Sequence, residues 1–122
     1  MFAITATAPM PDDPLAALRL GEHPDPVAPA GWEVVEVRAA SLNHHDLWTL
    51  RGVGVAPDRF PIVLGCDASG IASDGREVIV HGVVADPDGG DETLSPDFSI
   101  LSERHDGTFA DRVVVGICRR WR

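Results

Sequence analysis

The feature that most constrains the fold of this chain is a tight turn, Asp74-Gly75, set between two apolar segments. An Asp-Gly pair suits the short turn of a β-hairpin, because its glycine readily adopts the left-handed backbone conformation. The flanking residues 62–73 and 76–85 are rich in Val and Ile, which favour strands. The sequence therefore predicts an antiparallel hairpin in the middle of the chain.

Further short strands are predicted on both sides of this hairpin. Alternating apolar residues over 2–6 indicate a first strand, which a proline-rich stretch then ends. The next segment holds either a helical turn at 15–18 or a strand at 18–22, and we favour the strand. Residues 32–42 and 107–117 are rich in β-branched side chains and are predicted as strands. Strands separated by turn residues are typical of a mainly β barrel or sandwich.

One helix is predicted with defined ends, in "SLNHHDLWTLRG". Asn43 is a preferred N-cap residue, Asp46 follows three positions later, and Gly52 can supply the left-handed stop. Three apolar side chains of this helix are expected to pack inward: Leu47, Trp48 and Leu50.

Length, charge and hydropathy limit the classes of function. A chain of 122 residues suffices for one domain, which we expect at residues 1–115, followed by a short basic tail at 116–122. The net charge of −9 repels phosphate backbones and argues against nucleic-acid binding. No apolar run is long enough to cross a bilayer, and two cysteines form no disulfide framework. We therefore expect a cytoplasmic protein without membrane contact.

The segment Asn43-His44-His45-Asp46 offers two imidazoles and a carboxylate, a combination suited to proton transfer or metal binding. The alternative is purely structural, because Asn and Asp are also what a helix start needs for capping. Successive side chains on a helix point about 100° apart, so the two histidines do not easily face one metal ion. The residues alone leave both interpretations open.

Cys66 and Asp67 stand side by side between glycines, where the backbone can turn and a cleft can form. The alternative is that Cys66 is a small core residue. Metal binding through His44, His45, Cys66 and Asp67 is a further alternative, although no Cys-x-x-Cys pair typical of zinc sites is present. A Gly-x-Ser-x-Gly nucleophile turn is absent as well.

Four segments in a fixed order carry a family resemblance: "VRAASLNHHDLWTLRG", "FPIVLGCDASGIAS", "GREVIV" and "GTFADRVVV". Together they resemble the N-terminal, GroES-like domain of the medium-chain dehydrogenase/reductase superfamily, which includes zinc-type alcohol dehydrogenases and quinone oxidoreductases. The resemblance covers most of residues 1–115. It implies a mainly β fold, a partly open β-barrel with one or two short helices.

In zinc-dependent members of that family, a Cys stands three residues before the Asp of the first motif, and a His-Glu pair follows a Gly in the second. This sequence has Asn43 at the first position and Cys66-Asp67 at the second, and asparagine is a poor replacement for a thiolate. The family's lobe with four closely spaced cysteines is missing, and an acidic segment at 86–97 takes its place. The resemblance therefore implies the zinc-less, quinone-reductase-like branch, with no metal at the site.

The resemblance also implies roles for single residues. His45 matches the position of a hydroxyl that relays a proton in zinc-dependent members, so its imidazole is expected to act as acid or base. His44 matches a position that approaches the cofactor phosphates in some members. The implied site residues are His45, Asp46 and Asn43 at the catalytic centre, His44 toward the cofactor, and Cys66 and Asp67 in the substrate cleft.

The implied function is that of the substrate-side domain of an NAD(P)H-dependent oxidoreductase acting on a small carbonyl, alcohol or quinone. The family's second half, a Rossmann domain with a Gly-x-Gly-x-x-Gly turn, has no counterpart here. We therefore expect the chain to bind NAD(P)H weakly and to be inactive alone. The abrupt ending "GICRRWR" suggests a truncation, frameshift or fragment, and the face left open predicts self-association. The alternatives are a stand-alone GroES-like interaction module and a zinc-binding alcohol dehydrogenase fragment.

Overall fold

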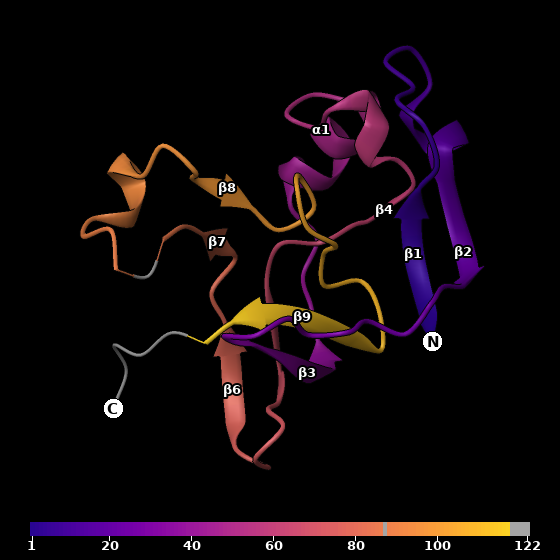
Figure 1. Ribbon diagram of the computed structural model, residues 1–122. Coiled ribbons are helices and arrows are strands. Elements are labelled where there is room, and N and C mark those ends of the chain that lie inside the picture. The colour runs from indigo at the N-terminus through magenta and orange to yellow at the C-terminus, as the bar shows by residue number, and fades with distance from the viewer. Residues whose placement is uncertain (87, 118–122) are drawn as a thin grey trace.

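The computed structural model describes residues 1–86 and 88–117, which form three small antiparallel sheets and one α-helix (Figure 1). The strands are β1 Phe2–Ala6, β2 Leu18–Glu22, β3 Trp32–Ala39, β4 Ile62–Val63, β5 Ala68–Ile71, β6 Glu77–Val80, β7 Val83–Val84, β8 Ser99–Ile100 and β9 Arg112–Gly116. The helices are α1 His44–Arg51 and the 3-10 turns η1 Pro14–Ala17, η2 Pro57–Arg59 and η3 Glu92–Leu94.

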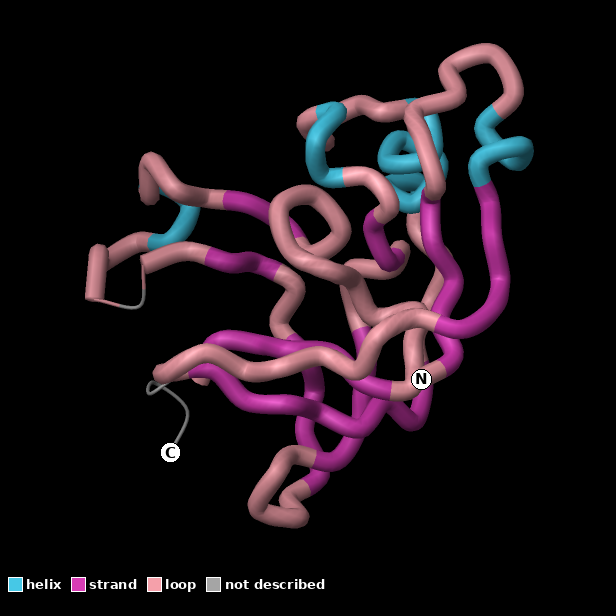
Figure 2. The backbone as a smooth tube through the Cα atoms, turned by 45° about the vertical axis from the view of Figure 1, so that its right-hand side comes forward, coloured by secondary structure: helices cyan, strands magenta, loops and turns pink. Residues whose placement is uncertain are grey.

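The three sheets have the strand orders β2-β1-β4, β6-β5-β3-β9 and β7-β8. The prediction of a mainly β fold with few short helices is confirmed (Figure 2). One isolated antiparallel bridge, between Ala3 of β1 and Ala110, joins the first sheet to the segment that leads into β9. The named strands otherwise stay in three separate sheets within the described ranges, and a closed barrel is not seen there.

The predicted hairpin is present as β5 and β6, with Ile71 opposite Glu77 at the turn. Gly75 has a φ of +85°, and the Asp74 carboxylate accepts a hydrogen bond from the Arg76 N–H at 3.1 Å. These contacts are local, which is why the sequence alone predicts them. Both alternatives for the segment after the first strand are realised, since η1 leads directly into β2.

The helix begins and ends as predicted, with Asn43 as N-cap and Gly52 in the left-handed conformation at φ +84°. The prediction for its apolar residues is only partly right. Leu50 is buried, whereas Leu47 and Trp48 are 42% and 48% exposed. The Arg51 guanidinium lies over the indole of Trp48, with its Cζ atom 5.4 Å from the centre of the ring.

The inward face of α1 is more polar than expected. Asp46 and Thr49 are buried there together with Leu50. The Thr49 hydroxyl donates to the Ser102 carbonyl at 3.2 Å, and Ser102 is itself fully buried. These polar contacts fix the rotation of the helix about its axis, so Leu47 and Trp48 are directed outward.

Two clusters of buried side chains form the core. The first lies between the β1 sheet and α1 and contains Ala6, Ala17, Leu50, Val55, Ile62 and Leu64. The second lies against the four-stranded sheet and contains Val35, Ala68, Val80, Leu101 and Val113. Residues 65–67 connect Leu64 of the first cluster to Ala68 of the second. Burial at both ends therefore anchors the segment that carries Cys66 and Asp67.

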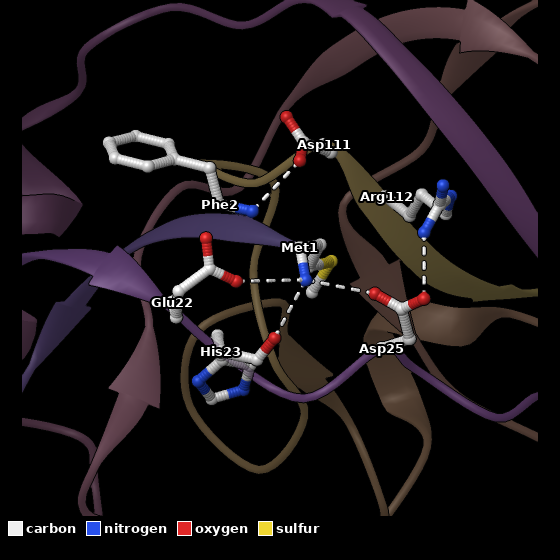
Figure 3. A network of polar contacts seen from close by, with 7 residues as sticks. All are labelled: Met1, Phe2, Glu22, His23, Asp25, Asp111 and Arg112. Atoms are coloured by element: carbon white, nitrogen blue, oxygen red, sulfur yellow. Dashed lines mark hydrogen bonds and ion pairs between the residues drawn. The ribbon is translucent and has the colours of Figure 1, made fainter.

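The start of the chain is tied to the four-stranded sheet by a surface network (Figure 3). The Met1 ammonium donates to the His23 carbonyl and to the Asp25 carboxylate, both at 2.9 Å, and Asp25 also accepts from Arg112 of β9 at 3.0 Å. The hydrogen bond to Asp25 raises the pKa of the Met1 amine, and the amine lowers the pKa of Asp25. Because the Asp25 and Arg112 side chains are exposed, their ion pair adds little to stability, and the network mainly orients the start of the chain.

The β7-β8 pair carries the acidic segment 86–97 away from the body of the molecule (Figure 1). The described residues of this segment are mostly exposed, as expected for a solvated loop, and His81 contacts Glu92 at 2.6 Å. No helix within residues 1–86 and 88–117 has the length and apolarity needed to cross a membrane. The predicted tail is described only at Gly116 and Ile117; its residues 118–122 lie outside the described residues.

Candidate functional site

Two segments predicted to carry chemistry meet in the folded chain. The Asp46 carboxylate accepts hydrogen bonds from the Gly65 N–H at 3.1 Å and from the Asn43 N–H at 2.8 Å. Asp46 is only 5% exposed. Since Gly65 directly precedes Cys66, this one carboxylate holds the start of α1 against the Cys66-Asp67 segment.

The Asp67 carboxylate makes a second bridge between the same segments. It accepts from the Ser41 N–H at 3.0 Å, from the Ser41 hydroxyl at 2.8 Å and from Asn43 Nδ2 at 3.0 Å. The Asp67 carbonyl accepts from the Thr108 hydroxyl at 2.7 Å. The Ser41 N–H, the Asn43 amide and the Ser41 hydroxyl together lower the pKa of Asp67. Asp67 is therefore an ionised anchor for residues 41–43.

Cys66 lies between Gly65 and Asp67, and its thiol is free and partly buried. Burial raises its pKa, and the carboxylates of Asp46, Asp67 and Glu103 raise it further. A thiol in such surroundings stays protonated at neutral pH and is a weak nucleophile. A methyl group on Gly82 would collide with the Cys66 carbonyl, so the backbone of Gly82 passes close beside it.

His45 extends from α1 toward a residue that the sequence analysis did not single out. Its Nε2 lies 3.2 Å from Glu103 Oε1, and the two side chains are 20% and 23% exposed. Glu103 Oε2 accepts from the Ile100 N–H at 2.9 Å. Glu103 and His45 are 58 positions apart, and no local pattern in the sequence indicates their contact.

The structure brings most of the predicted site residues together. Asn43, Asp46 and Asp67 take part in the two bridges described above, Cys66 lies between Gly65 and Asp67, and His45 is next to Asp46 on α1. His44, the first residue of α1, is exposed and takes no part in either bridge. Ser41 and Glu103 complete the cluster and were missed, Glu103 because its partner is distant in sequence.

The residues suggested as metal ligands are not arranged around one point. Within residues 1–86 and 88–117, no group of three or more His, Cys, Asp or Glu side chains is placed to hold a metal ion. Asn43 Nδ2 acts as a hydrogen-bond donor, and the Asp67 oxygens are occupied as acceptors. The donor set therefore builds a hydrogen-bonded bridge and does not match a tetrahedral zinc site.

The lowered pKa of Asp67 predicts a specific acid sensitivity. Its contribution to stability is complete above the unfolded pKa of about 3.9 and is lost as the pH falls through the lower folded value. We expect the melting temperature of the wild type to fall more steeply below pH 4 than that of Asp67→Asn. Asp58→Asn, at an exposed aspartate of η2, serves as the control and should keep the wild-type slope. Equal slopes for Asp67→Asn and the wild type would contradict the prediction.

No protein-family profile and no curated protein sequence matches the chain. Solved structures do match. An NAD-dependent alcohol dehydrogenase has a TM-score of 0.82 and 28% identity, over 96% of this chain and 38% of that one. A crotonyl-CoA carboxylase/reductase has a TM-score of 0.82 and 27% identity, over 96% of this chain and 32% of that one. The crotonyl-CoA carboxylase/reductase AntE in complex with NADP has a TM-score of 0.77 and 25% identity, over 95% and 35%.

The chain thus spans about a third of the length of these enzymes. Nearly all of this chain, 95–96%, takes part in each match. The similarity therefore concerns one part of each of these larger enzymes.

Proposed function

Because this chain has the fold of the N-terminal, GroES-like domain of the medium-chain dehydrogenase/reductase superfamily, we propose that it is the substrate-side domain of a zinc-less NAD(P)H-dependent oxidoreductase. The proposed substrate is a small carbonyl, alcohol or quinone compound. A Rossmann domain would supply the cofactor site, so we expect the isolated chain to be inactive or nearly so.

One observation carries the zinc-less part of the proposal. Asn43 stands where zinc-dependent members have a cysteine ligand, and its Nδ2 donates to Asp67 Oδ2 at 3.0 Å. An amide nitrogen engaged as a donor offers no lone pair to a metal. These residues do not fit a zinc ion, and no step of the proposed reaction involves one.

The chain's residues do not fit a dinucleotide site either. Every strand pairing among the described residues is antiparallel, and the sequence has no Gly-x-Gly-x-x-Gly turn at a helix start. NAD(P)H bound to the other domain would supply the hydride. What this chain contributes is the wall against which the substrate lies.

We assign the site residues to roles on this wall. His45 is proposed to exchange the proton that the substrate oxygen gains or loses, because it is the partly exposed imidazole of the site. Asn43 and Asp46 hold the start of α1 in place, and Cys66 and Asp67 form the adjoining surface. His44 is proposed to face the cofactor, since it is exposed at the start of the helix.

An apolar groove adjoining the site is the proposed contact for a cofactor-binding domain or for a second copy of the chain. Its lining includes Phe2, Leu42 and Phe109, and Leu42 is 85% exposed. Leu42 directly precedes Asn43, so a partner seated in the groove would also cover the site. An uncovered apolar surface of this kind favours self-association of the isolated chain.

Zinc and NADPH measurements on the purified 122-residue chain test the proposal. We expect far less than one zinc per chain by elemental analysis. We also expect no saturable micromolar binding when NADPH is titrated and tryptophan fluorescence is followed, with Trp48 beside the site as the main reporter. Stoichiometric zinc would refute the zinc-less assignment. Tight NADPH binding would refute the claim that the cofactor site lies in another domain.

A further inference from the structure

The carboxylate of Glu103 faces two groups at once. Its Oε2 accepts the Ile100 N–H at 2.9 Å, and its Oε1 lies 3.2 Å from His45 Nε2. The first contact is within a loop of four residues, and the second reaches across to α1. Glu103 is therefore held by its own loop in the position from which it contacts the imidazole.

This contact dictates where the imidazole carries its proton. An ionised carboxylate can only accept hydrogen bonds, so the nitrogen that faces it must carry the hydrogen. A neutral His45 is then protonated at Nε2 and bare at Nδ1. Each oxygen of the Glu103 carboxylate then accepts from one donor: Oε2 from the Ile100 N–H, and Oε1 from the His45 Nε2–H.

The other side of the ring offers no competing hydrogen bond. His45 Nδ1 is buried and has no hydrogen-bond partner among the described residues. It is unpaired whether it carries a hydrogen or a lone pair, so the contact with Glu103 decides the tautomer.

We infer that Glu103 is a positioning residue for His45: it holds the imidazole in one orientation, as the tautomer protonated at Nε2. The purpose of this positioning rests on the proposed function, in which His45 is part of the wall against which the substrate lies. The positioning itself follows from the geometry of the isolated chain and can be tested without any activity.

The test uses long-range proton–nitrogen NMR correlations of the ¹⁵N-labelled 122-residue chain above pH 8. In the wild type we expect His45 as the Nε2–H tautomer, with a downfield Nε2–H proton that exchanges slowly with water. In Glu103→Gln we expect that proton to be lost or moved to Nδ1, because an amide offers one acceptor oxygen where two donors must be met. An Nδ1–H tautomer in the wild type would overturn the inference, whether or not the variant folds.

Glu92→Gln is the matched control, because Glu92 makes a second His–Glu contact among the described residues, with the exposed His81. It should leave the His45 resonances unchanged. If Glu103→Gln retains the wild-type Nε2–H signal, Glu103 does not position the ring and the inference fails. Zinc or NADPH binding by the chain would refute the proposed function while leaving these spectra as expected, so the two failures can be told apart.

Discussion

Replacing Gly65 by alanine is expected to cause a large loss of stability, about 2–5 kcal/mol. Gly65 has a φ of +92°, and a Cβ atom there would lie 2.5 Å from both Phe109 Cδ1 and Thr108 Oγ1. Overpacking costs about 1–3 kcal/mol, and a left-handed conformation costs a non-glycine residue a further 1–2 kcal/mol or so. Phe109 packs against the first core cluster and Thr108 is fully buried, so neither can move freely.

Gly75→Ala is the matched control for this substitution. Gly75 has a similar φ of +85°, but a Cβ atom there would meet nothing within 4 Å. Urea unfolding should show a loss of about 1–2 kcal/mol for Gly75→Ala and a larger loss, about 2–5 kcal/mol, for Gly65→Ala. Equal losses in the two variants would mean that backbone strain alone, and not the close packing behind the site, accounts for the need for glycine.

Removal of the Asp46 carboxylate is expected to have the second-largest effect. Asp46→Ala leaves the buried Gly65 N–H without an acceptor and also removes the bond to Asn43. An unsatisfied buried donor costs about 1–3 kcal/mol, and the lost capping contact adds about 1 kcal/mol. We expect a total loss of about 2–4 kcal/mol in urea unfolding, with faster amide exchange at Gly65.

The control for this second prediction is Asp91→Ala. The Asp91 carboxylate also accepts two hydrogen bonds, from the N–H and the hydroxyl of Thr93, but it lies in solvent. Water can replace it there, so the loss should stay within about 1 kcal/mol. If Asp46→Ala were no more costly than Asp91→Ala, Asp46 would not be the bridge that joins α1 to Gly65.

The parts of the fold that were correctly predicted depend on contacts between near neighbours in sequence. The Asp74-Gly75 turn and the ends of α1 at Asn43 and Gly52 each involve a few consecutive residues. Turn and cap preferences are properties of such short segments, so they can be read without knowledge of the rest of the molecule. The pairing of Asn43 with Asp46 belongs to the same class.

The errors in the helix have a tertiary cause. Leu47 and Trp48 are apolar and were expected inside, but α1 is rotated so that Asp46 and Thr49 are buried instead. Their partners are Gly65 and Ser102, which come from distant parts of the chain. A prediction from hydropathy places polar side chains at the surface, because it contains no information on whether a buried hydrogen-bond partner is available. It therefore assigned Leu47 and Trp48 to the core in place of Asp46 and Thr49.

The candidate site likewise combines residues that the sequence predicts with one that only the folded chain reveals. The predicted residues Asn43, Asp46 and Asp67 do come together, and their two bridges define it. Glu103 was not predicted, because its contact with His45 spans 58 positions and only the folded chain brings them together. The tautomer inferred for His45 therefore depends entirely on tertiary structure.

By itself, the sequence determined the local elements: short strands, a hairpin at Asp74-Gly75 and a helix that begins after Asn43, as well as the resemblance that points to a GroES-like domain. These follow from backbone preferences and from the order of short motifs. Only the tertiary structure decided which face of α1 is buried, that Asp46 and Asp67 bridge two segments, and that Glu103 faces His45. Long-range hydrogen bonds and packing make these choices, and their partners are fixed by the path of the chain in space.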